Sequence, residues 1–217
     1  EYFDDPRLQK AFTFQNIYVG QNPYEAPAFF SMLPGAEIAE GALFPKGGMH
    51  RIIQTLVALA DKNGVQIFCK KPVEKIILNG KKAEGILLED GTIVHADLVI
   101  ASADLPYVYD KLLRDKRKTR SLKRKEYSCS AIVFHWAVDK VYEQLDHHSV
   151  FLNDPFREGL DAIFKEKSLS GNPSFYIHAP VRSDKTAAPE NQDSLSVIVP
   201  VAHLDARADQ DWKALKE

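Results

Sequence analysis

The chain has 217 residues, 45% hydrophobic and 27% charged, a composition that is typical of a folded globular protein and excludes extensive disorder. Its formal net charge of -2 excludes a general electrostatic attraction to nucleic acid. Two cysteines, Cys69 and Cys129, are too few for a disulfide framework, which favours a reducing, cytoplasmic compartment. No apolar run approaches the roughly 18 residues of a membrane-spanning helix.

The N-terminal part of the chain predicts a helix followed by irregular structure. Residues 5–14 have Leu8 and Phe12 at helical spacing, and Pro6 suits the first helical turn. Residues 15–45 are rich in aromatic residues, proline and glycine, which predicts turns and short elements. So many aromatic residues either pack a core or line an apolar pocket, and composition alone favours the core.

The clearest helix of the sequence is predicted to end at Asn63-Gly64, a good stop signal. Its apolar stripe consists of Met49, Ile52, Ile53, Leu56, Val57 and Ala60. Val65, Ile67 and Cys69 then alternate with polar residues, which predicts a strand directly after the helix.

A three-stranded meander is predicted next. Its strands are expected at residues 75–78, 83–88 and 92–95. The pairs Asn79-Gly80 and Asp90-Gly91 supply the turns between them. Residues 98–101 are then continuously apolar, which is typical of a strand buried on both faces.

Nine Lys and Arg residues crowd into residues 111–125. Leu112, Leu113 and Leu122 interrupt these charges as on a helix with one solvated face, and no aromatic residue is interleaved. A solvent-exposed helix face is therefore the first interpretation. Contact with an anionic membrane surface is the second, and nucleic-acid binding is a distant third.

The C-terminal half predicts several strands and one further helix. The strands are expected at residues 131–138, 150–152, 174–178 and 195–199, and the helix at 155–167. Strands and helices that do not alternate strictly indicate an α+β domain with a largely antiparallel sheet. The predicted fold class of the whole chain is thus α+β, a mixed α/β protein.

Few residues carry a recognisable chemistry. The sequence Gly-x-Gly is absent, which excludes a dinucleotide fingerprint or a Walker A loop within this chain. Gly47-Gly48 precede the clearest helix, where free backbone N–H groups can approach a ligand, but on these residues alone a simple loop-to-helix turn is the favoured interpretation. No pair among the seven His residues has the spacing and carboxylate company of a zinc site, so no metal is predicted.

Seven segments carry a resemblance to known proteins. They are residues 5–15, 18–23, 44–49, 101–104, 145–149, 174–180 and 199–204. In sequence and in order they resemble the bacterial-type phytoene desaturase family, which are FAD-dependent carotenoid desaturases of the amine-oxidase-like flavoprotein superfamily. The resemblance runs nearly end to end, and both ends of the chain look like cuts through a longer protein. We therefore expect an internal fragment of such an enzyme.

The resemblance implies a domain organisation. Residues 46–104 would belong to an FAD-binding domain of the two-dinucleotide-binding-domain type, built from helix, strand, β-meander and buried strand. Residues 1–45 and 105–217 would form the first and second parts of a substrate domain with a largely antiparallel sheet and helices. FAD would be bound by the full-length parent and not by this fragment.

The resemblance also implies positions for a flavin site. Val73 matches a position whose backbone lies against the adenine, and Ser102 and Ala103 match a turn near the pyrophosphate and the flavin. Gly47 and Gly48 would lie close to the flavin or to the substrate. No residue is assigned a catalytic role.

In that family two hydrogens leave a long polyene hydrocarbon, as a hydride to the flavin and a proton. Such a substrate has no hydrogen-bonding group, so an apolar channel must bind it. Phe29 and Phe30 are expected to line that channel, and Arg7 is a polar residue near its reacting end without an assigned role. A polyene isomerase or saturase of the family, or a non-catalytic lipid-escort protein with the architecture of GDP-dissociation inhibitors, remains an alternative. Expected partners are the apolar polyene and a membrane surface, and not nucleic acid.

Overall fold

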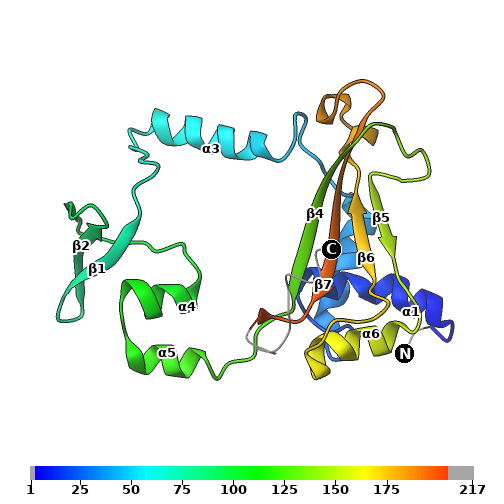
Figure 1. Cartoon of the computed structure of the whole chain (residues 1–217), viewed down its shortest axis with the longest axis horizontal. Helices are drawn as coiled ribbons and strands as arrows, with labels where there is room; N and C mark the ends of the chain where they lie inside the picture. Colours follow the sequence, from blue (N-terminus) through cyan, green and yellow to red (C-terminus); the bar gives the residue numbers. More distant parts are fainter. Residues whose placement is uncertain (1–2, 205–217) are drawn as a thin grey trace. The chain divides into compact units, whose positions relative to one another are not determined.

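The computed structural model describes residues 3–204, which form two compact units. The large unit contains residues 3–58 and 127–204, and the small unit contains residues 59–126 (Figure 1). The chain therefore leaves the large unit and returns to it, with changeovers later than the expected 45/46 and 104/105. The second changeover is late because Val108 and Leu112 are buried in a helical segment that packs against the first strand of the meander.

A four-stranded antiparallel sheet organises the large unit. Its strands lie in the order β4 (Ser130–Val138), β7 (Asp193–Val201), β6 (Phe175–His178) and β5 (His148–Phe151). All three neighbouring pairs are antiparallel, which confirms the predicted sheet type.

The central strand β7 has one closed and one open face. Leu195, Val197 and Val201 are almost completely buried, whereas Ile198 and Pro200 on the other face are only half-buried. This alternation follows from the two-residue period of a strand, which sends successive side chains to opposite faces. The sheet thus contributes one face to the core and leaves the other for a cavity.

The N-terminal helix α1 (Pro6–Thr13) is confirmed at its predicted position. The carboxylate of Asp5 accepts the backbone N–H of Arg7 at 2.8 Å, so Asp5 caps the helix, and Pro6 occupies its first turn. The guanidinium of Arg7 pairs with the same carboxylate at the surface.

The other helical elements of the large unit are short, apart from α3, which crosses the changeover between the units. They are η1 (Phe14–Val19), η2 (Ala28–Ser31), α2 (Met32–Glu40), α3 (His50–Lys62), α6 (Phe156–Asp161), η4 (Ala162–Glu166), η5 (Pro180–Arg182) and η6 (Lys185–Ala187). The single helix predicted at 155–167 is found as α6 and η4, and it ends where Lys167 turns to a φ of 57°.

The small unit contains the predicted meander. Strands β1 (Val73–Asn79), β2 (Lys82–Leu88) and β3 (Ile93–His95) form an antiparallel sheet in that order. Three helical elements follow, namely α4 (Leu105–Tyr107), η3 (Val108–Leu112) and α5 (Lys116–Leu122).

Two predicted strands are wrong. Residues 65–69 and 98–101 pair with no other strand in the described part of the chain, and Leu98 and Ile100 are 74% and 83% exposed. A strand buried on both faces needs hydrogen-bonding neighbours on its edges and layers above and below it. Residues 3–204 provide neither to these segments, although their local pattern is that of strands.

Candidate functional site

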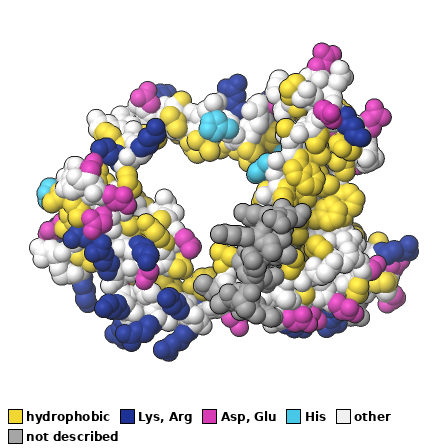
Figure 2. Space-filling view, in the orientation of Figure 1, with side chains coloured by type: hydrophobic (Ala, Val, Ile, Leu, Met, Phe, Trp, Pro, Cys, Tyr) yellow, Lys and Arg dark blue, Asp and Glu magenta, His cyan; other side chains and the backbone are white. Residues whose placement is uncertain are grey.

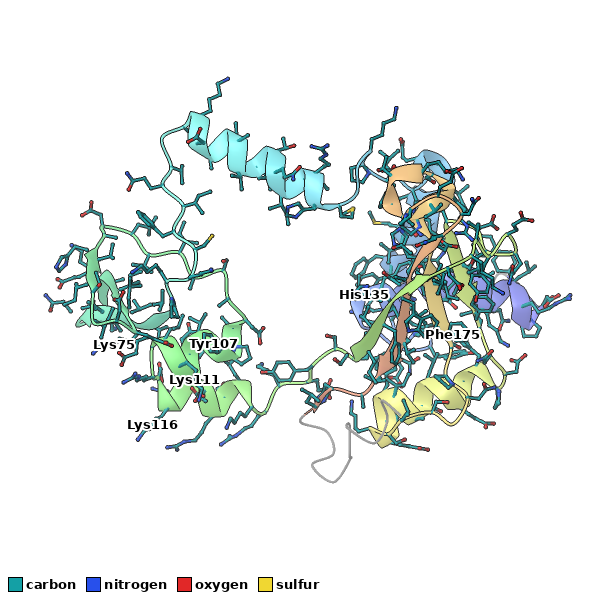
Figure 3. All side chains as sticks on the ribbon, turned by 45° about the horizontal axis from the view of Figure 1, so that its top comes forward. Lys75, Tyr107, Lys111, Lys116, His135 and Phe175 are labelled. Carbon is teal, nitrogen blue, oxygen red and sulfur yellow. The ribbon has the colours of Figure 1, made fainter. Side chains whose placement is uncertain are left out.

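A cavity of about 920 Å³ opens against one face of the sheet in the large unit. Its floor contains Val150, Tyr176 and Ile198, which lie side by side on β5, β6 and β7 because the strand register pairs them. Phe175, labelled in Figure 3 on β6, also contributes to the lining. Most of the remaining lining is aliphatic or aromatic, so the cavity suits an apolar ligand.

The opposite wall of the cavity is formed by η1 and is held to the sheet by Gly20. Phe14 and Tyr18 line this wall, with their rings edge to face and their centroids 5.7 Å apart. Gly20 ends η1 with a φ of +71°, and a Cβ at this position would lie 2.3 Å from the Cβ of Ser128. Only glycine therefore allows the wall to approach the chain just before β4 so closely.

Polar side chains collect at one part of the lining. The imidazole Nδ1 of His148 and the hydroxyl of Tyr176 are hydrogen-bonded at 2.6 Å. Burial raises the pKa of Tyr18 to about 12, and the neighbouring charges of Glu37 and Tyr176 add to this. Glu37 accepts a hydrogen bond from the side chain of Gln15 at 3.3 Å. The phenol of Tyr18 is therefore a neutral hydrogen-bond donor at physiological pH.

A histidine cluster lies directly beside this polar part. The Nε2 atoms of His147 and His178 are 2.9 Å apart, and His147 Nδ1 lies 2.6 Å from the Ser183 hydroxyl. The ring of Phe44 packs on both imidazoles, with centroids 4.9 and 5.4 Å away. One imidazole must donate and the other accept in the Nε2 to Nε2 hydrogen bond, so the pair cannot hold two full positive charges in this geometry.

The electrostatics of the cluster agree with that geometry. Burial lowers the pKa of His147, and the neighbouring His148 and Arg182 lower it further. The pKa of His178 is lowered by burial first and then by His147 and His148. Both rings are thus neutral near pH 7, and they hold Phe44 and its loop against the sheet.

The structure places Gly47 and Gly48 in the loop before α3, both with φ above +80°. The predicted free amides are not free, because the N–H of Gly47 donates to Asp184 Oδ2 at 2.7 Å and that of Gly48 donates to the Pro45 carbonyl at 3.0 Å. No atom lies within 4 Å of a Cβ built on Gly48. A side chain at Gly48 would therefore meet open space, and the roles of Gly47 and Gly48 toward a flavin stay predictions.

The other flavin-site residues lie in the small unit. Val73 is the first residue of β1, is half-buried and is in register with Leu88. Ser102 and Ala103 are exposed in the segment between β3 and α4. No hydrogen bond among the described residues joins Val73 to either of them, so their roles toward a flavin stay predictions.

The predicted channel residues Phe29 and Phe30 stack on each other, with centroids 4.2 Å apart, and Phe29 is 61% exposed. Neither lines the cavity, whereas Tyr18 from the same aromatic part of the sequence and Phe14 just before it do. His148 and Tyr176 were missed by the sequence reasoning. The alternation within their strands was the available signal, but it does not reveal which strands are neighbours.

Neither a metal site nor a membrane-spanning helix is found among the described residues. Within residues 3–204, no group of three or more His, Cys, Asp or Glu side chains is arranged to hold a metal ion. Among the helices of that same part, none has the length and the apolar character needed to cross a membrane.

Comparison with known proteins gives a consistent family. Residues 1–212 match the family described as flavin containing amine oxidoreductase. The chain is 44% identical over 207 residues to the phytoene desaturase of Cercospora nicotianae, covering 94% of this chain and 33% of the relative. It is 43% identical over 215 residues to the zeta-carotene-forming phytoene desaturase of Myxococcus xanthus, covering 98% of this chain and 41% of the relative. A 4,4'-diapolycopene oxygenase from a Methylomonas species is 34% identical over 220 residues, covering 100% of this chain and 44% of the relative.

The chain thus spans between a third and less than half of the length of these relatives. Among solved structures, an oxidoreductase from Methanosarcina mazei superposes with a TM-score of 0.68 at 20% identity. The match covers 98% of this chain and 46% of that protein, so the two share a fold.

Proposed function

Because the chain belongs to the flavin containing amine oxidoreductase family, we propose that it is part of an FAD-dependent oxidoreductase that desaturates a carotenoid precursor such as phytoene. The observation that carries this proposal is the apolar cavity of about 920 Å³ between η1 and the sheet. A hydrocarbon polyene can be held only by burial of apolar surface, at about 25 cal/mol per Å². The names of the relatives from Cercospora and Myxococcus support the same substrate class.

In this proposal the large unit contributes the substrate side and the small unit contributes part of the FAD-binding side. FAD, when the full-length parent binds it, supplies the hydride acceptor. Gly47, Gly48, Val73, Ser102 and Ala103 stay predicted to contribute part of its contact surface. This chain has no glycine-rich pyrophosphate loop, so we expect the 217-residue chain alone to be colourless and inactive. Its own residues bind the polyene, orient it and exclude water.

Filling the cavity tests this proposal in the full-length parent. Val150→Phe places a ring on the cavity floor, and we expect it to lower kcat/KM for phytoene at least tenfold. Val141→Phe is the control, because Val141 is exposed and lies outside the lining. Wild-type turnover by the Val150→Phe enzyme would show that the cavity is not the substrate site. A full-length protein purified without flavin would contradict the whole proposal and favour a lipid-escort role.

The chemistry performed on the polyene is open to a second candidate. The Methylomonas relative named as an oxygenase matches the whole chain, although at 34% identity. Product analysis by mass spectrometry distinguishes the outcomes. Desaturation removes two mass units per step, saturation adds two, isomerisation leaves the mass unchanged, and oxygenation adds the mass of oxygen. We expect loss of two units.

We also propose that the full-length parent is cytoplasmic and makes peripheral contact with an anionic membrane surface. The small unit has fifteen Lys and Arg against ten Asp and Glu, a net charge of +5, whereas the rest of the chain has thirteen against twenty. Figure 2 shows Lys and Arg side chains gathered on this unit, and Lys111 and Lys116 are labelled in Figure 3. Arg117, Arg120 and Arg124 line one hollow and make no ion pair with a described residue.

Co-sedimentation with vesicles tests this contact. Each basic residue near an anionic surface contributes about 1 kcal/mol, so we expect binding to phosphatidylserine vesicles that salt weakens. A triple substitution of Arg117, Arg120 and Arg124 by Gln should abolish it. A matched replacement of Lys70, Lys81 and Lys82 should have less effect. Equal binding to neutral vesicles, or preference for single-stranded DNA over vesicles, would contradict the proposal.

A further inference from the structure

The polar part of the cavity is unexpected for a site that binds only a hydrocarbon. Tyr18, Glu37, His148 and Tyr176 all line it, although the rest of the lining is largely apolar. His148 and Tyr176 satisfy each other through their hydrogen bond of 2.6 Å. These two side chains therefore tolerate an apolar neighbour without losing a hydrogen bond.

Tyr18 and Glu37 differ from that satisfied pair. The hydroxyl of Tyr18 makes no hydrogen bond with any residue between 3 and 204. One oxygen of Glu37, Oε2, accepts a long bond of 3.3 Å from Gln15, and no hydrogen bond to Oε1 is found among the same residues. A pure hydrocarbon would cover both groups and strip their water without replacing it, which is unfavourable.

The two groups complement each other chemically. The phenol of Tyr18 keeps its proton at neutral pH and is a donor, while the Glu37 carboxyl offers an acceptor oxygen. They come from adjoining elements, η1 and α2, which the bond from Gln15 to Glu37 connects. An alcohol is the simple group that accepts one hydrogen bond and donates another, whereas a carbonyl only accepts.

We propose that this cavity selects an acyclic isoprenoid carrying one hydroxyl group, with the hydroxyl between Tyr18 and Glu37 and the hydrocarbon chain along the sheet floor. The proposal rests on the proposed function, because it takes the ligand to be an isoprenoid chain. It adds a recognition point for oxygen and names Tyr18 as the specificity-determining residue. The apolar floor at Val150 and Ile198 binds the chain without regard to that oxygen.

A matched pair of ligands tests the proposal on the full-length parent. Geranylgeraniol and the C20 hydrocarbon that lacks only its hydroxyl are compared by equilibrium dialysis in the same detergent. We expect the alcohol to bind about fivefold more tightly than the hydrocarbon, the contribution of one net hydrogen bond. Tyr18→Phe should remove this preference, because the alcohol loses its donor and the hydrocarbon no longer covers an unpaired hydroxyl.

Two controls separate the possible results. Tyr24→Phe loses a phenol that packs beside Phe156 outside the cavity, and it should keep the fivefold preference. Glu37→Ala removes the acceptor and should likewise reduce the preference for the alcohol. Equal binding of both ligands to the wild-type protein overturns the oxygen recognition and leaves the proposed function standing. Failure of both ligands to bind overturns the use of this cavity for isoprenoids altogether.

Discussion

Replacing Asp193 by Ala should destabilise the large unit more than any surface change, because its carboxylate is fully buried. The carboxylate pairs with the Arg182 guanidinium and also accepts backbone N–H groups of Ser194 at 3.0 Å and of Tyr142 at 3.4 Å. Arg182 in turn donates to the carbonyl of Leu145 at 2.9 Å and to that of Tyr142. Removing the anion leaves a buried cation without its counter-charge, which costs about 3–5 kcal/mol.

Urea unfolding followed by circular dichroism measures this effect. With a slope of about 2 kcal/mol per M, the loss corresponds to a fall in the midpoint of roughly 1.5–2.5 M. Arg114→Ala is the control, because its ion pair with Glu74 is exposed and should contribute less than about 1 kcal/mol. The urea midpoint of Asp193→Asn should lie between those of Asp193→Ala and Arg114→Ala, since the amide oxygen still accepts hydrogen bonds. A midpoint for Asp193→Ala equal to that of the control would refute the reasoning.

Two further predictions concern histidine charge and backbone geometry. The pKa values of His147 and His178 are lowered in the folded protein, so the unfolded chain binds protons first as the pH falls. The free energy of unfolding should therefore be highest above about pH 6.5 and should decrease below it. Replacing both His147 and His178 by Gln should remove most of this pH dependence. Urea midpoints measured between pH 8 and pH 5 test both expectations. Gly20→Ala should destabilise by about 1–3 kcal/mol through its φ of +71° and its clash with Ser128. Gly35 lies in α2 with open space where a Cβ would lie, so Gly35→Ala should raise the free energy of unfolding by about 0.5–1 kcal/mol. Equal melting temperatures for the Gly20→Ala and Gly35→Ala variants would contradict this account.

The elements that the sequence predicted correctly are those whose signals are local. Helix α1 follows from Pro6 and the helical spacing of Leu8 and Phe12, and the meander follows from two turn pairs. Residues 65–69 and 98–101 have equally good local patterns but no pairing partner among the described residues, so they form no strand. Pairing is a property of two segments, and the pattern of one segment cannot contain it.

The same reasoning explains the cavity. Tyr18 and Tyr176 are 158 positions apart in the chain and meet only because η1 lies over the cavity face of the sheet. Tyr18 from the aromatic part of the sequence lines the cavity, whereas the rings of Phe29 and Phe30 stack on each other. The free amide predicted at Gly47 is used by Asp184, a partner 137 positions away. Each of these outcomes depends on tertiary neighbours and not on spacing.

The division of charge between the units has a practical consequence for handling the protein. A net charge of -2 suggests a nearly neutral molecule, but +5 on the small unit leaves -7 on the rest of the chain. Such a molecule should adhere to both cation and anion exchange resins at low ionic strength. Copies should also attract one another through opposite units until salt shortens the Debye length to about 8–10 Å, near 0.1–0.15 M. Turbidity that clears on adding salt would be the visible sign of this polarity.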